Sequence, residues 1–119
     1  MRLSKQNSDP VWAAFELSDV FEQRQQAGRP WLPFLTASTM TVGVYALPEA
    51  GLDPQVPHER DELYYVISGK AKLQVEGDSM DVGPGSTVYV RAFAEHRFHD
   101  IEEELKVLVF FSTAEPPRD

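Results

Sequence analysis

The chain has 119 residues, of which 42% are hydrophobic and 25% charged, a composition that fits one globular domain with a single core. Its formal net charge of −8 repels phosphate backbones and anionic lipids, which argues against binding to nucleic acid or to a membrane surface. The chain contains no cysteine, which excludes disulfides, thiolate nucleophiles and cysteine-bound zinc. A polar N-terminal stretch and the absence of any apolar run of about eighteen residues predict a cytoplasmic protein.

Residues 1–35 are predicted to form an arm followed by one short helix. Met1–Pro10 is polar and reads as a loose arm. A helix is expected over Ser18–Ala27, because Ser18 or Asp19 can cap its start and Gly28 can end it.

From residue 36 onward the apolar residues recur with a period of two, which is typical of strands. Turn residues separate short β-branched and aromatic runs at a spacing of roughly ten residues, and no helical pattern lies between them. The sequence therefore predicts an all-β sandwich or barrel over residues 36–114, with a polar tail over residues 115–119. The predicted strands are Thr39–Leu47, Leu63–Ile67, Ala71–Val75, Ser86–Arg91, Glu95–His99 and Leu105–Ser112, with turns at Glu76–Ser79 and Glu102–Glu104.

The run Val107–Phe111 carries apolar side chains on both faces of the predicted strand. A strand that is apolar on both sides is expected to be covered on both sides. Either the N-terminal helix or a second subunit could provide the outer cover.

All three histidines of the chain lie in the predicted barrel, and His58 is followed at the fourth position by Glu62. In a straight strand these two residues would be roughly 13 Å apart, too far to share one metal ion. The intervening residues 59–61 are therefore expected to bend, so that both side chains reach a common point. His96 follows several strands later. Two imidazoles and one carboxylate suit Fe(II), Mn(II), Zn(II) or Ni(II), with coordination positions left open for water or substrate.

These residues resemble the two sequence motifs of the cupin superfamily. His58, Glu62 and Gly69 match the second His, the Glu and the closing Gly of the first motif, and Gly85 and His96 match the opening Gly and the His of the second. The chain is similar to the small single-domain bacterial cupins. The resemblance implies a double-stranded β-helix, or jelly-roll, barrel with a metal-binding pocket, and a homodimer.

The chain departs from the cupin pattern at several positions. Val56 occupies the place of the first motif's first His, which leaves two His and one Glu of the four family ligands. Gln55 could supply an oxygen, but its parity in a regular strand points it away. Arg91 and Phe93 replace the Pro and Gly of the second motif.

Three further residues are candidates for the pocket or its surroundings. Tyr64 shares the parity of Glu62 and can face the pocket or pack in the core. Phe98 shares the parity of His96 and is expected to fill the barrel. His99 has the opposite parity and is expected at the surface or behind a ligand.

Two functions follow from this site. The first is a metal-dependent enzyme of the dioxygenase or isomerase type, in which His58, Glu62 and His96 hold a divalent ion that acts on a small organic molecule. The second is a non-catalytic barrel that binds or senses a small ligand and retains a degenerate metal site. The fold alone does not decide between them.

Overall fold

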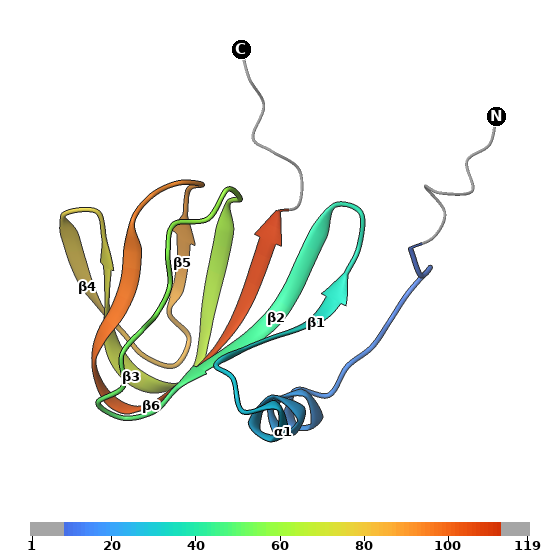
Figure 1. Cartoon of the computed structure of the whole chain (residues 1–119), viewed down its shortest axis with the longest axis horizontal. Coiled ribbons are helices and arrows are strands. Elements are labelled where there is room, and N and C mark those ends of the chain that lie inside the picture. Colours follow the sequence, from blue (N-terminus) through green and yellow to red (C-terminus); the bar gives the residue numbers. More distant parts are fainter. Residues whose placement is uncertain (1–8, 113–119) are drawn as a thin grey trace, which may run out of the picture.

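The computed structural model describes residues 9–112, which form a curled antiparallel sheet and one helix (Figure 1). In these residues the all-β prediction is confirmed, and nothing after the first strand is helical. Most of the predicted arm and the predicted tail over residues 115–119 lie outside the described range. The elements are α1 (Leu17–Ala27), β1 (Trp31–Thr36), β2 (Met40–Leu47), β3 (Glu62–Val75), β4 (Asp78–Val82), β5 (Thr87–Val90) and β6 (His96–Ser112).

The helix ends where the sequence predicts but begins differently. Gly28 adopts the left-handed conformation at φ 73°, and its N–H donates to the carbonyls of Arg24 and Gln25, as expected for a glycine at a helix C-terminus. The predicted caps Ser18 and Asp19 are wrong, because the helix begins at Leu17 and the residue before it makes no side-chain capping bond.

The sheet runs in the order β1-β2-β6-β3-β4, and β5 pairs with β3. The long strands β3 and β6 pair along two stretches, and the register shifts between Val66 and Lys72. Gly69 lies in this region at φ 100°, and a Cβ there would overlap the backbone of Glu104 and Leu105. Only glycine fits so close an approach of two backbones, so this position bends the paired strands.

The strand prediction needs several corrections. Strands β1 and β4 were not expected, and the sheet begins at Trp31 rather than at residue 36. Strands β3 and β6 were each expected as two shorter strands. Residues 102–104 are exposed as expected, but they continue β6 instead of forming a turn. Pairing with a neighbouring strand makes these elements longer, and the residue pattern within one strand does not reveal such pairing.

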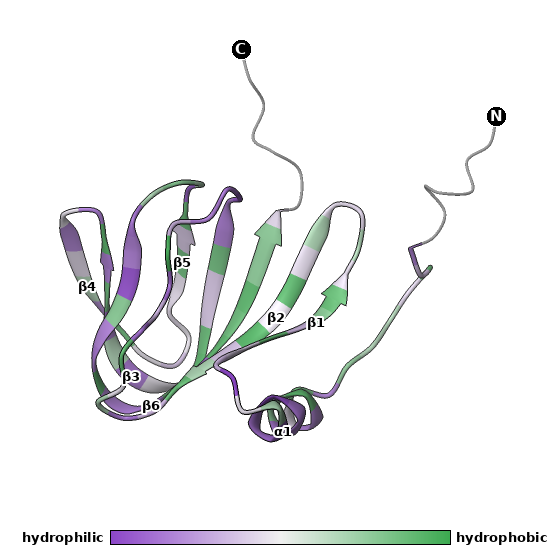
Figure 2. Cartoon of the chain, in the orientation of Figure 1, coloured by the Kyte–Doolittle hydropathy of each residue, from purple (hydrophilic) through white to green (hydrophobic). Residues whose placement is uncertain are grey.

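The core lies inside the curl of the sheet. Figure 2 shows hydrophobic residues along β2 and the adjoining end of β6, and hydrophilic residues on much of α1. Tyr64, Phe98 and Leu105 are among the largest fully buried side chains, and Phe98 therefore fills the barrel as predicted. The face of α1 that carries Val20 packs against β1 and β2.

The helix covers part of the outer face of the sheet. Lys106 lies 5.3 Å from the ring centroid of Phe21, and Lys106 pairs with Ala46 across the sheet. Farther along the sheet Leu63, Tyr65 and Tyr89 remain exposed. The second subunit expected from the sequence stays a prediction.

Within residues 9–112 no helix is long and apolar enough to cross a membrane, since α1 has 11 residues. The expected cytoplasmic location stays a prediction.

Candidate metal centre

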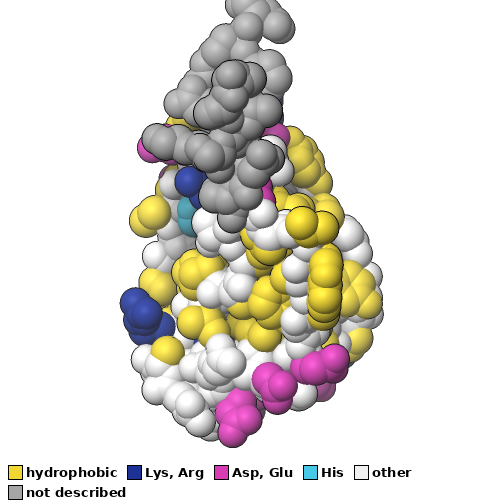
Figure 3. Space-filling model, turned by 90° about the vertical axis from the view of Figure 1, so that its right-hand side faces the viewer, with side chains coloured by type: hydrophobic (Ala, Val, Ile, Leu, Met, Phe, Trp, Pro, Cys, Tyr) yellow, Lys and Arg dark blue, Asp and Glu magenta, His cyan; other side chains and the backbone are white. Residues whose placement is uncertain are grey.

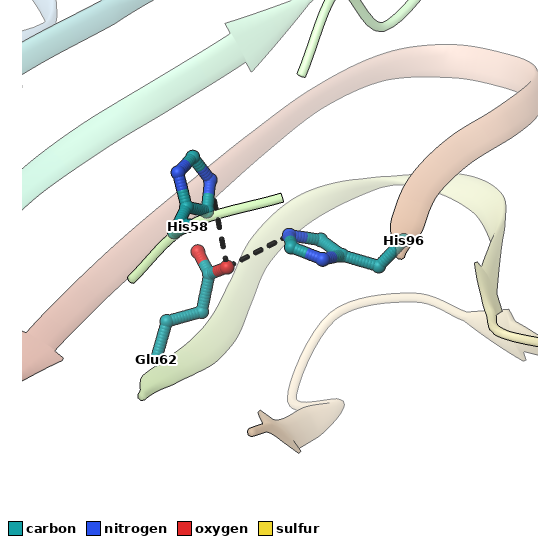
Figure 4. A group of neighbouring side chains, drawn as sticks. All are labelled: His58, Glu62 and His96. Atoms are coloured by element: carbon teal, nitrogen blue, oxygen red, sulfur yellow. Dashed lines mark ion pairs between the residues drawn. The ribbon is translucent and has the colours of Figure 1, made fainter. Parts of the chain in front are cut away.

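The three predicted ligands meet at one point inside the curled sheet. His58 belongs to the loop before β3, Glu62 is the first residue of β3, and His96 is the first residue of β6. Their ligand atoms all lie within 4.8 Å of one another. Figure 4 shows both imidazole rings next to the same oxygen of the Glu62 carboxylate, Oε1, which lies 2.8 Å from His96 Nε2 and 3.8 Å from His58 Nε2.

The loop that carries His58 is held by main-chain contacts. The N–H of Phe93 donates to the carbonyl of His58 at 2.6 Å. The side chain of Asp61 accepts a hydrogen bond from the N–H of Ala92 at 2.9 Å, and the main-chain N–H of Asp61 donates to Ser112 Oγ. The chain bends between these anchors, as the sequence predicts, but His58 itself lies in a loop and not at the end of a strand.

Two of the ligand atoms are buried without a hydrogen bond. The side chains of Glu62 and His96 are each 2% exposed, and Glu62 Oε2 and His96 Nε2 have no hydrogen-bond partner among the described residues. His96 Nε2 and Glu62 Oε1 lie close, but the imidazole nitrogen does not point at that oxygen as in a hydrogen bond. Buried polar atoms are rarely left unpaired, so a bound group is expected to satisfy them.

The imidazole of His96 is oriented for metal binding. Its Nδ1 lies 2.8 Å from the carbonyl of Ala94, and a carbonyl can only accept, so Nδ1 carries the proton. In the neutral ring the lone pair is then on Nε2, which lies beside Glu62, and a proton on Nδ1 with Nε2 free for the ion is the usual arrangement of a metal-bound histidine.

Burial and neighbouring charges move the pKa values of the two histidines in opposite directions. Burial lowers the pKa of His58, and the nearby Glu62 only partly counters this. Burial also acts to lower the pKa of His96, but contacts with Glu62 and the Ala94 carbonyl outweigh it and raise the pKa. His58 is therefore available as the neutral ligand that a metal requires, whereas a proton competes more strongly for His96.

The separations between the ligand atoms fit a single ion. Two atoms that each lie about 2.0–2.2 Å from one metal are about 2.8–3.6 Å apart when they are neighbours in a tetrahedral or octahedral site. The observed 2.8 Å lies at the lower end of this range and the observed 3.8 Å just above it. The three ligand atoms span up to 4.8 Å, so the side chains would draw together by about 1 Å to hold one ion.

Gln55 points into the site, contrary to the expectation from its parity. It belongs to an irregular loop, so the alternation of a strand does not apply to it. Its Oε1 lies 3.3 Å from His58 Nε2 and accepts a 2.7 Å hydrogen bond from the hydroxyl of Tyr64. Val56, in the place of the missing family His, is 66% exposed and lines the mouth of the cavity.

The remaining candidates separate into core and surface. Tyr64 is buried, packs edge-on against Phe98 with ring centroids 5.0 Å apart, and reaches the site through its hydroxyl. His99 faces away from the site, where it contacts Ser79 Oγ at 3.0 Å and Asp100 at 3.3 Å.

The sequence analysis missed Asp53, which organises the polar groups around the site. Its carboxylate accepts hydrogen bonds from the Gln55 side chain and main chain, from the Tyr45 hydroxyl and from the N–H of Phe98. These donors come from three separate parts of the chain, so no local pattern could have revealed the cluster.

A cavity of about 980 Å³ opens beside His58 and Glu62. Figure 3 views the molecule from the side of β1 and β2 and shows hydrophobic side chains across the middle of that face. Aromatic rings form part of the cavity wall: Trp31 packs edge-on against Phe111, which in turn packs against His58. The charged side chains that line the cavity are Arg29, His58, Glu59, Arg60 and Glu62.

Comparison with known sequences identifies the family. The profile of the cupin domain matches residues 43–111, a segment that carries the entire proposed metal site. The chain belongs to the cupin family. The uncharacterized protein SCO3923 of Streptomyces coelicolor is 43% identical to this chain over 102 residues, which cover 86% of this chain and 97% of that protein.

Solved structures confirm the cupin jelly-roll fold. The structure of TT1209 from Thermus thermophilus superposes with a TM-score of 0.71 at 20% identity, over 85% of this cupin and 97% of that chain. KdgF from a Halomonas species superposes with a TM-score of 0.63 at 20% identity, over 75% and 79% of the two chains. At these identities the likeness shows the fold alone.

Proposed function

We propose that this cupin binds a divalent first-row metal ion through His58, Glu62 and His96 and uses it on a small organic molecule held in the adjoining cavity. The observation that carries the proposal is the pair of buried ligand atoms without a hydrogen bond, Glu62 Oε2 and His96 Nε2, beside a third ligand. A site of two His and one carboxylate leaves open positions for a substrate.

The bound ion would act as a Lewis acid on a substrate oxygen or, as iron, support chemistry of the dioxygenase type. The protein's own contribution is to orient the ligands and to exclude water. The Ala94 carbonyl fixes the His96 ring, and the rings of Trp31 and Phe111 form an apolar wall beside His58. Such a wall lowers the local dielectric and strengthens the electrostatic interactions of the site.

Tyr64 and His99 are further side chains that could transfer a proton, and Tyr64 reaches the site. Tyr64 lines the cavity, and burial together with the charge of Glu62 raises the pKa of its hydroxyl well above its ordinary value. Tyr64 is therefore expected to stay protonated and to donate a hydrogen bond, not to act as a base. His99 lies on the other side of the sheet from the site and does not line the cavity.

One observation favours the second candidate function, a cupin that binds or senses a ligand without catalysis. Val56, whose side chain cannot bind a metal, stands where the family has its first His. Weak metal affinity is tolerable in a protein that performs no chemistry. If the protein is an enzyme, its Glu62→Gln variant should lose turnover while staying folded. If it is a sensor, it should keep its ligand affinity after metal removal.

Elemental analysis of tag-free protein tests the metal site directly. We expect close to one divalent ion per chain in the parent and none in a folded His58→Ala, His96→Ala double variant. His99→Ala is the matched control, because it removes an imidazole that lies outside the site, and it should keep the metal. A parent that stays metal-free after exposure to Fe(II), Mn(II), Zn(II) and Ni(II) would refute the proposal.

A further inference from the structure

We infer that the side-chain oxygen of Gln55 is a fourth metal ligand and takes the role of the family His that Val56 replaces. The inference rests on the proposed metal site. Its first support is distance: Gln55 Oε1 lies 3.3 Å from His58 Nε2, within the range of about 2.8–3.6 Å expected for neighbouring ligands of one ion. Amide oxygens are ligands for hard divalent cations.

Asp53 determines which end of the Gln55 amide faces the site. A carboxylate can only accept hydrogen bonds, so the amide group must turn its NH₂ toward Asp53. Gln55 Nε2 donates to Asp53 Oδ2 at 2.6 Å, and Oε1 on the opposite side accepts from Tyr64. A reversed amide would place two acceptors against each other at Asp53.

The orientation of Asp53 is itself fixed by parts of the chain that lie far from Gln55. The N–H of Phe98, in β6, donates to Asp53 Oδ2 at 2.8 Å, and the hydroxyl of Tyr45, in β2, donates to Oδ1. The main-chain N–H of Gln55 donates to the same Oδ1. The amide oxygen is thereby held toward His58 before any ion binds, which reduces the ordering cost of coordination.

Binding of Co(II) to the purified protein tests this inference. Gln55→Leu keeps the approximate size of the side chain and removes the oxygen. We expect about tenfold weaker Co(II) binding or more, together with a change in the visible absorption of the bound ion, because the spectrum reports coordination. Gln25→Leu, on the exposed face of α1, is the matched control and should behave as the parent.

The outcomes separate this inference from the proposed function. Parent-like Co(II) affinity and an unchanged spectrum in Gln55→Leu would overturn the role of Gln55 and leave the three-ligand site intact. A parent that binds no Co(II) would overturn both. A weakened affinity with an unchanged spectrum would make Gln55 a positioning residue and would also overturn its assignment as a ligand.

A separate observation at the cavity mouth points to the class of molecule that the cavity holds. Arg29 and Arg60 both line the cavity, and neither pairs with a carboxylate among residues 9–112. Arg60 lies between two proposed metal ligands, and Arg29 lies two residues before the wall residue Trp31. The main-chain carbonyl of Arg29 is held by the guanidinium of Arg24 at 3.0 Å.

The geometry points to a small molecule with an apolar body and an oxyanion group, either carboxylate or phosphate. Guanidinium groups recognise both oxyanions through paired hydrogen bonds. Apart from the proposed ligands, the charged residues that line the cavity are these two arginines and Glu59, which leaves one positive charge at the mouth of a chain of net charge −8. The apolar body would lie against Trp31 and Phe111.

Binding of 3-phenylpropionate, phenyl phosphate and the neutral 3-phenylpropanamide to metal-free protein, measured by NMR titration, tests this second inference. We expect one or both anions to bind about tenfold more tightly than the amide, the scale of a charged hydrogen bond. An Arg29→Ala, Arg60→Ala variant should lose that preference, and Arg91→Ala, which removes an exposed arginine outside the cavity, should keep it. Equal affinities in the parent, or a preference that survives in the double variant, would overturn it.

Discussion

Replacing Glu62 by Gln is expected to change stability in opposite directions with and without metal. In the metal-free protein Glu62 is a buried carboxylate whose Oε2 has no hydrogen bond among the described residues. Gln is of similar size and neutral, and its NH₂ can donate to the lone pair of His96 Nε2. Once the pH is high enough for metal-free His96 to be neutral, Glu62→Gln should therefore be at least as stable as the parent.

The magnitudes follow from the burial of these atoms and from mass action. An unsatisfied buried polar atom costs about 1–3 kcal/mol, which bounds the gain in the metal-free variant. An ion at about one hundred times its Kd stabilises the parent by about 2.7 kcal/mol. For a domain of this size that corresponds to an increase in Tm of about 10 °C, which Glu62→Gln should lack.

Differential scanning calorimetry at pH 8 of both proteins, after metal removal and again with added Mn(II) or Zn(II), measures both effects. The Tm of the parent should rise with metal and that of Glu62→Gln should stay constant. Refutation would take either of two forms: a metal-free variant that is several kcal/mol less stable than the metal-free parent, or equal metal-induced shifts in the two proteins.

Three further predictions concern the bend, the loop and the site. Gly69→Ala should lower the free energy of unfolding by more than about 2 kcal/mol in urea titrations, because its Cβ would meet the Leu105 backbone at φ 100°; a neutral effect would contradict the bend. Phe93→Gly should be about 1 kcal/mol more stable than Phe93→Ala, because Phe93 has φ 71° and only Gly relieves that strain. In metal-free protein the raised pKa of His96 contributes stability that is fully present below its ordinary value of 6.5 and is lost as pH rises through the higher folded value. The stability difference between parent and His96→Gln should therefore shrink from pH 6 to pH 8, and a difference that grows would contradict the sign.

The sequence predicted the strands where one face is apolar and the other polar. The alternation in Thr39–Leu47 and Ala71–Val75 is local, and the structure confirms both as parts of strands. The sequence did not predict β1 and β4, because β1 contains Pro33 and four of the five residues of β4 are exposed. Their extended conformation depends on pairing with β2 and β3, which a local pattern does not contain.

The same contrast applies to the metal site. The spacing between His58 and Glu62, and the later His96, were sufficient to select the three ligands, because a metal requires particular side chains and the chain has only three histidines. The alternation of side chains predicted the wrong direction for Gln55, because side chains alternate between two faces only where the backbone is a regular strand. The orientation of its amide depends on Asp53, which accepts from residues in β2 and β6.

By itself, then, the sequence determined which side chains could bind a metal and which segments could be strands, since both depend on residue type and on short spacings. The tertiary structure decided which of these side chains meet, because the curl of β3 and β6 brings the first residue of each strand to the same point. It also decided that Gln55 faces the site and that Arg29 and Arg60 share one cavity. These placements depend on contacts between residues that are distant in the chain, which local sequence patterns do not encode.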